Sequence, residues 1–175
     1  GTTYTASLFI KAAERGFGFL VLGAAGGFPT TAISINLTTG AVTTAVGTPL
    51  NAFTQTLPNG WFRVGFSIAA NASGASVINL YTSVDGVDAN RSYAGNASNG
   101  IYVWGMQCEA GNDPTSYIRT VGSAVTRVRD SFLSTGANFD SWYNQLEGSV
   151  IVEGRKPFPA APSSAFGLFS ASDGT

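Results

Sequence analysis

The chain has no histidine, and this absence restricts its chemistry more than any other feature. Without histidine, a Ser/His or Cys/His nucleophilic centre cannot be built, and the commonest zinc ligand is missing. The ten acidic residues are scattered mostly through turns, which does not favour a paired-carboxylate glycosidase. We therefore expect that this segment is not an enzyme.

Cysteine and charge are also scarce. The single cysteine, Cys108, excludes an intrachain disulfide, and its place in an apolar alternation predicts a buried thiol. Charged residues make up 11% of the chain, against about 25% in ordinary soluble domains, and the net charge is −1. With no run of Lys or Arg and no stretch of about 18 apolar residues, we expect neither nucleic-acid binding nor membrane insertion.

What the chain does have is a series of short β-type runs separated by turn residues, without a sustained 3.6-residue apolar period. Their lengths and spacing predict an all-β fold, an antiparallel β-sandwich. The chain starts directly before the first run, so we expect a piece of a longer polypeptide that lacks the N-terminal strands of this sandwich. The expected strands are residues 4–12, 17–22, 32–37, 41–46, 52–56, 61–69, 76–84, 100–109 and 124–132.

Two tight turns are expected between these strands. Gly40 ends the turn that begins at Thr38, because glycine accepts a positive φ. The Asn59-Gly60 pair before Trp61 predicts a type I′ or related hairpin turn. In the strand that follows, Phe62, Val64, Phe66 and Ile68 form a wholly apolar face, which we expect to be the core face.

Carbohydrate recognition is the function that the aromatic residues favour, since sugar faces stack on Trp and Tyr while Asn and Asp bond to hydroxyls. Residues 84–100 have the composition of a ligand-contacting loop. Ordinary packing is the competing interpretation for each aromatic residue, and we assign Trp104 to the core. The candidate carbohydrate-binding residues are Trp61, Tyr81, Tyr93, Asp85, Asn90 and Trp142.

No metal or cofactor is required by these residues. Asp85 and Asp88 lie close together in a turn, where a solvated pair is the first interpretation. Binding of Ca²⁺ by these two carboxylates with neighbouring carbonyl oxygens is the alternative.

Several segments, taken in order, resemble a known family. Residues 4–12 (YTASLFIKA), 57–64 (LPNGWFRV) and 101–130 (from IYVWGMQCEAG to GSAVTRVRD) are similar to β-sandwich modules of bacteriophage tail and virion fibre proteins, of the "WGAQLEAG…PTSYIPT…GSAVTRAAD" type. Cys108 stands where that family usually has Leu, and Arg119 where it usually has Pro. The resemblance implies a jelly-roll sandwich like that of carbohydrate-binding modules, assembled as a homotrimer in a virion.

The pattern changes after residue 133, so we expect two parts, a sandwich module in residues 1–133 and a different unit in residues 134–175. Residues 141–153 resemble the "FSSWYNQSEGTLYVE" opening of concanavalin A-like or laminin-G-like domains. About 40 residues cannot build a full sandwich. Residues 134–175 are therefore interpreted as a linker and the first strands of a second, incomplete β-domain.

Together these features predict a structural and adhesive module of a bacteriophage fibre, spike or other virion appendage. Its expected partners are other virion proteins and the polysaccharide or lipopolysaccharide of a host cell surface. Two alternatives stay open: a purely structural spacer without a glycan site, and an accessory carbohydrate-binding domain of a polysaccharide-degrading enzyme.

Overall fold

The computed structural model describes residues 1–23 and 27–126, together with the single residues 137, 141, 144, 147 and 151. The chain divides into two compact units, of which the first contains Gly1–Tyr117 and the second begins at Ile118. Apart from those single residues, the expected second β-domain in residues 134–175, with its candidate Trp142, lies outside the described residues.

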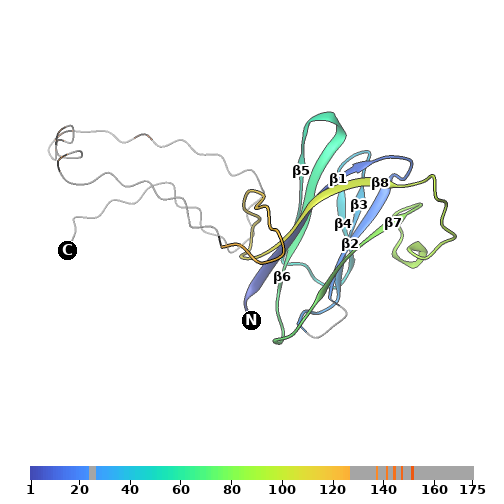
Figure 1. Ribbon diagram of the computed structural model, residues 1–175, viewed down its shortest axis with the longest axis horizontal. Coiled ribbons are helices and arrows are strands. Elements are labelled where there is room, and N and C mark those ends of the chain that lie inside the picture. Colours follow the sequence, from blue (N-terminus) through green and yellow to red (C-terminus); the bar gives the residue numbers. More distant parts are fainter. Residues whose placement is uncertain are drawn as a thin grey trace. The chain divides into compact units, whose positions relative to one another are not determined.

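The first unit is an antiparallel β-sandwich, as predicted (Figure 1). Sheet A has the strand order β5-β6-β1-β8, and sheet B has the order β4-β3-β2-β7. For each of the first eight predicted strands, both the first and the last residue lie within one position of those observed. The strands are β1 (Thr3–Ala12), β2 (Phe17–Gly23), β3 (Thr31–Asn36), β4 (Val42–Val46), β5 (Asn51–Thr56), β6 (Trp61–Ala69), β7 (Val77–Ser83) and β8 (Ile101–Ala110).

The ninth predicted strand, residues 124–132, is not confirmed. Residues 124–126 are described and belong to no strand, and residues 127–132 lie outside the described residues. Helical structure in the described part of the chain includes two short 3₁₀ turns, Pro58–Gly60 and Asp88–Asn90.

The hydrophobic core lies between the two sheets and follows the alternation of the strands. The predicted core face of β6 is confirmed, because all four of its residues belong to one buried cluster. Facing side chains come from both sheets, which is what seals a sandwich against water. The buried members include Leu8 and Ile10 of β1, Leu20 and Leu22 of β2, Ile33 and Ile35 of β3, and Phe62, Val64, Phe66 and Ile68 of β6.

Strand β2 is buried on both faces. Its residues 18–23 are all buried, and Phe19 and Val21 form a separate small cluster with Ala32 of β3. These side chains alternate with Leu20 and Leu22 and therefore point to the outer side of sheet B. A continuous apolar run in a strand thus corresponds here to a second, smaller core outside the sandwich.

Both predicted hairpin turns are confirmed by the backbone. Gly40 has φ +75° and ends the turn between β3 and β4, where Asn36 Oδ1 accepts hydrogen bonds from the N–H groups of Thr38 and Thr39 at 3.0 and 3.2 Å. Asn59 (φ +60°) and Gly60 (φ +74°) form the turn between β5 and β6, and the N–H of Trp61 bonds to the Pro58 carbonyl. Two consecutive positive φ values define a type I′ turn.

Candidate functional site

Strands β6, β1 and β8 place their outward side chains in rows across the outer face of sheet A. Residues directly opposite on neighbouring strands have Cβ atoms about 4.5–5.5 Å apart, so each row forms a continuous line of side chains. One row consists of Trp61, Lys11 and Tyr102, and the next consists of Arg63, Phe9 and Trp104. We use the term aromatic face for the rings on this surface, which are Phe9, Trp61, Tyr102, Trp104 and Tyr117.

The second row forms a stack that runs across three strands. The rings of Phe9 and Trp104 are nearly parallel, at 11°, with centroids 4.1 Å apart. On the other side, the guanidinium carbon of Arg63 lies 5.3 Å from the Phe9 centroid. Tyr117 meets both rings edge-on, with centroids 5.3 Å from Trp104 and 6.3 Å from Phe9. Aromatic contacts of this kind fix the orientation of each ring.

The outer rings of this surface are open to solvent. Trp104 is 48% exposed, Tyr102 is 55% exposed and Tyr117 is 39% exposed. The assignment of Trp104 to the core is therefore wrong. Its strand has two apolar sides, and the inner one is fixed by the pairing with β1, in which Val103 lies opposite the core residue Ile10.

A bulge in β8 changes which residues share the aromatic face. The register shifts between Ser7 and Phe9 of β1, whose partners on β8 are Gln107 and Trp104. Within the extra stretch, Gly105 has φ +62°, a conformation that glycine adopts readily. Because of the shift, Gln107 and Glu109 join Trp104 on the outer face instead of alternating with it. Polar groups thus follow directly after the rings.

Glu109 is held by the chain that follows β8. Its Oε1 accepts a hydrogen bond from Gln107 Nε2 at 2.6 Å and one from the Thr115 N–H at 2.9 Å. Its Oε2 accepts a hydrogen bond from Thr115 Oγ1 at 2.6 Å. Both carboxylate oxygens of Glu109 are therefore engaged, and they fix the chain just before Tyr117.

This crossing segment, residues 111–117, covers one half of the outer face of sheet A. Thr5 Oγ1 of the central strand β1 donates to the Gly111 carbonyl at 2.8 Å. Asn51 Nδ2, on the far edge strand β5, donates to Asp113 Oδ1 at 3.1 Å. Pro114 is buried. The segment thus reaches across the far half of the sheet, and its last residue, Tyr117, packs edge-on against Phe9 and Trp104.

Arg63 supports the stack from a buried position. It is 5% exposed, and its Nη2 donates to Ser7 Oγ at 3.1 Å. Burial lowers the pKa of the guanidinium from its usual value, and the negative charge of Glu109 opposes this effect. Since arginine keeps its proton throughout the physiological range, a buried positive charge lies beside the Phe9 ring.

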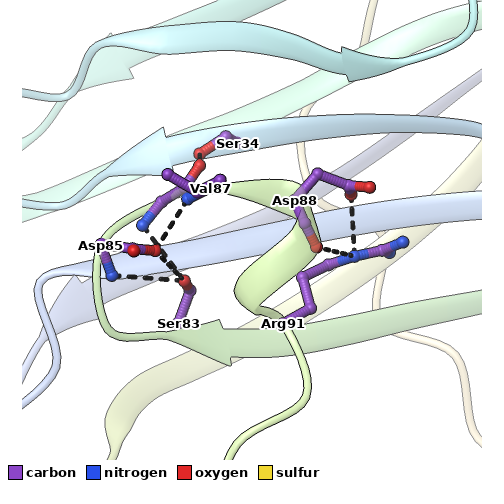
Figure 2. Close-up of polar contacts among 7 residues, drawn as sticks. Ser34, Ser83, Asp85, Val87, Asp88 and Arg91 are labelled. Carbon is purple, nitrogen blue, oxygen red and sulfur yellow. Dashed lines mark hydrogen bonds and ion pairs between the residues drawn. The ribbon is translucent and has the colours of Figure 1, made fainter.

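On the outer face of sheet B, the loop after β7 (residues 84–100) folds back over the strands (Figure 2). Ser34 Oγ of β3 donates to the Gly86 carbonyl at 3.0 Å. Arg91 lies over Phe19 and Tyr81, with distances of 5.6 and 5.3 Å from its guanidinium carbon to the ring centroids. The same guanidinium is 2.8 Å from the carboxylate of Asp88. The loop therefore covers part of this face with an ion pair.

Asp85 and Asn90, two candidate sugar-binding residues, bond to each other inside this loop. Asp85 Oδ2 accepts from Asn90 Nδ2 at 2.6 Å, and its Oδ1 accepts from the Val87 N–H at 3.0 Å. These bonds hold the pKa of the Asp85 carboxyl below its ordinary value, with the Val87 N–H as the largest cause. Within the described residues, no three His, Cys, Asp or Glu side chains come together in the way that metal ligands do.

Tyr81 and Tyr93 are not brought together. Tyr81 is 40% exposed on the outer face of sheet B, where Arg91 approaches its ring. The hydroxyl of Tyr93 forms a hydrogen bond with Thr82 Oγ1, and Arg15 lies 4.9 Å from the centroid of its ring. Because Tyr81 and Thr82 are consecutive in β7, their side chains point to opposite faces of the sheet.

Among the predicted site residues that are described, Trp61 lies on the aromatic face, opposite Lys11. Tyr102 and Trp104 were not among those candidates, although their spacing of two residues in a strand places them on one face. The glycine between Trp104 and Met106 was the available signal, since glycine inside a strand pattern indicates a bulge. Phe9 and Tyr117 gave no such signal, because only the pairing of distant segments brings them to Trp104.

A cleft with a volume of about 840 Å³ opens elsewhere in the first unit. Tyr4, Leu22, Ile78 and Cys108 contribute to its lining. Cys108 is exposed, so the prediction of a buried thiol is wrong. Protein atoms around the sulfur remove part of its water and raise the pKa of the thiol, and Glu109 raises it further. The shifted register places Cys108 opposite Ala6 on the edge strand β8, where it lines this cleft.

The sequence was compared with family models and with curated proteins. No family model matches the sequence, and a search of curated proteins found no match. In the described part of the chain, no helix has the length and apolar character needed to cross a membrane.

Proposed function

We propose that this chain is a structural and adhesive module of a bacteriophage fibre, spike or other virion appendage, and that it binds host-surface carbohydrate through the aromatic face. The observation that carries the carbohydrate assignment is the exposed pair Tyr102 and Trp104, of which Trp104 is held by its stack with Phe9. The virion assignment is supported by the sequence resemblance to phage fibre modules.

The chemistry of the surface suits a sugar. The C–H side of a pyranose ring is apolar and flat, so it stacks on indole and phenol rings that are held in place before binding. Hydroxyl groups at the rim of the sugar need hydrogen-bonding partners. The Tyr102 hydroxyl, the Lys11 ammonium and the side chain of Gln55, which lies opposite Arg63 on β5, border the rings and offer such groups.

A shallow open surface gives weak binding to one sugar, and repetition strengthens it. In a homotrimer with many copies on a particle, the second and third contacts become intramolecular, so that avidity exceeds the affinity of one site by about 10²–10⁴. The low charge of the chain favours contact with neutral or weakly charged surfaces and limits non-specific attraction.

The test is a binding measurement against polysaccharide and lipopolysaccharide purified from candidate host bacteria. We expect the wild-type chain to bind, and Trp104→Ala and Tyr102→Ala each to weaken binding about tenfold or more because a stacking ring is lost. Tyr81→Ala is the matched control, since that tyrosine is similarly exposed on the other sheet. No binding to any host glycan, or equal losses in all three variants, would contradict the proposal.

The assembly is tested separately by the mass of the chain in solution. A homotrimer is the expected species, and a monomer at high concentration would contradict the fibre assignment. A trimer that binds no glycan would favour the spacer function. Glycan binding by a chain whose parent protein carries a polysaccharide-degrading domain would favour the accessory-domain function.

A further inference from the structure

The open half of the outer face of sheet A carries an unusual charge pattern. Its described cationic residues are Arg63, which is buried and bonded to Ser7, and Lys11, which is partly exposed. Lys11 lies directly between Trp61 and Tyr102 in the pairing of the strands. In the described part of the chain, Lys11 has no ion-pair partner. Its charge is therefore available to a ligand that rests on the neighbouring rings.

The acidic residues of this face lie in its other half and are already engaged. Both oxygens of Glu109 accept hydrogen bonds from Gln107 and Thr115. Asp113 accepts a hydrogen bond from Asn51 on the far side of the sheet. Among the described residues of the aromatic rows, the charged group that is partly exposed is therefore the Lys11 ammonium.

From this juxtaposition we propose that the aromatic face selects saccharides that carry a carboxylate, with a sugar ring on Tyr102 and Trp104 and the carboxylate on the Lys11 ammonium. The inference rests on the proposed function, because it names the class of glycan that the same surface binds. Lys11 is the direct cross-strand neighbour of Tyr102 and the diagonal neighbour of Trp104, and diagonal neighbours are about 7–8 Å apart. The flexible four-carbon side chain of lysine covers such a distance.

A carboxylate fits this position better than a neutral hydroxyl does. A hydrogen bond between an ammonium and a carboxylate is about twice as strong as one between neutral groups. Next to stacked rings, part of the surrounding water is displaced by the bound sugar, so the Coulomb attraction is screened less than at a bare surface. We expect the charge to contribute about tenfold in affinity.

The experiment uses a panel of bacterial surface polysaccharides, each in its native form and in a form whose carboxyl groups have been reduced to primary alcohols. The wild-type chain is expected to bind carboxylated members best and to lose about tenfold in affinity on reduction. Lys11→Gln is expected to bind native and reduced forms alike, whereas Lys11→Arg is expected to retain the preference. Raising the salt concentration should weaken wild-type binding and leave Lys11→Gln nearly unchanged.

The outcomes separate this inference from the function on which it rests. If the best ligand is neutral, sulfated or phosphorylated, or if carboxyl reduction has no effect while Trp104→Ala still abolishes binding, the carboxylate assignment is overturned and the carbohydrate function stands. If no member of the panel binds, both are overturned. Denaturation curves of the two Lys11 variants verify that they fold like the wild type.

Discussion

The outer faces of the two sheets carry similar aromatic residues but are covered in different ways. On sheet B, the loop after β7 places Arg91 over Phe19 and Tyr81, and Phe19 is completely buried. On sheet A, the crossing segment 111–117 covers one half of the face and leaves Trp104 open. The comparison shows that an outward-pointing ring is a core residue or a surface residue depending on the path of a distant segment.

The two faces also use charge differently. Over sheet B, the arginine lies above the rings and is paired with Asp88. Over sheet A, Arg63 lies among the rings, beneath the solvent-exposed surface. Arg91 approaches Phe19 and Tyr81 from the loop, whereas Arg63 approaches Phe9 from the neighbouring strand β6.

The largest expected effect comes from truncating the corresponding phenylalanines. Phe19→Ala should lower the free energy of unfolding by about 3–5 kcal/mol, because it leaves a cavity under the loop. Phe9→Ala should cost less, about 1–3 kcal/mol, since its ring is partly exposed, but it should abolish support for Trp104 and weaken glycan binding. Urea denaturation measures the free energy of unfolding, and a titration measures glycan binding. Equal destabilisation by the two variants would contradict the difference in burial.

A smaller effect is expected at the bulge. Gly105→Ala should cost about 1–2 kcal/mol, because φ is +62° there and a Cβ would lie 2.8 Å from the Phe9 ring. Displacement of Phe9 and of Tyr117, 3.3 Å from the same Cβ, should also weaken glycan binding. Gly95→Ala is the control, because a Cβ there meets nothing within 4 Å. Unchanged binding by Gly105→Ala would show that the stack is not needed.

Removal of Arg91, which covers part of sheet B, should lower the stability modestly and leave glycan binding unchanged. Arg91→Ala removes the ion pair with Asp88 and the contacts with two rings, and we expect a loss of about 1 kcal/mol. Glycan binding at the aromatic face should stay at its wild-type level. Denaturation and binding measurements check the two expectations, and weaker glycan binding would place part of the site on sheet B.

The smallest expected effect is a local change in the loop around Asp85 at low pH. The pKa of Asp85 is lower in the folded loop than its ordinary value of 3.8, so its stabilising hydrogen bonds are present above that value and are lost as the pH falls through the folded pKa. An NMR titration of the Val87 amide from about pH 5 to about pH 2 should report this local change. In Asp85→Asn the step should disappear, and its persistence would assign it to another group.

Local sequence patterns were sufficient for most of the fold. Alternation located the strands and the inner face of β6, and the Asn59-Gly60 pair located a type I′ turn, because these features depend on residues close together in the chain. The candidate site was predicted less well. Trp61 lies on the aromatic face, but Trp104 was assigned to the core because its strand offers two apolar sides.

The sequence by itself determined the first eight strands, two of their turns, the side of β6 that faces inward and the absence of histidine chemistry. The tertiary structure decided which rings remain open to solvent. Burial of an outward side chain depends on segments far away in the chain, as in the contact between Asn51 and Asp113, 62 residues apart. Periodicity distinguishes the two sides of a strand, but only the folded path of the chain determines whether another segment covers each side.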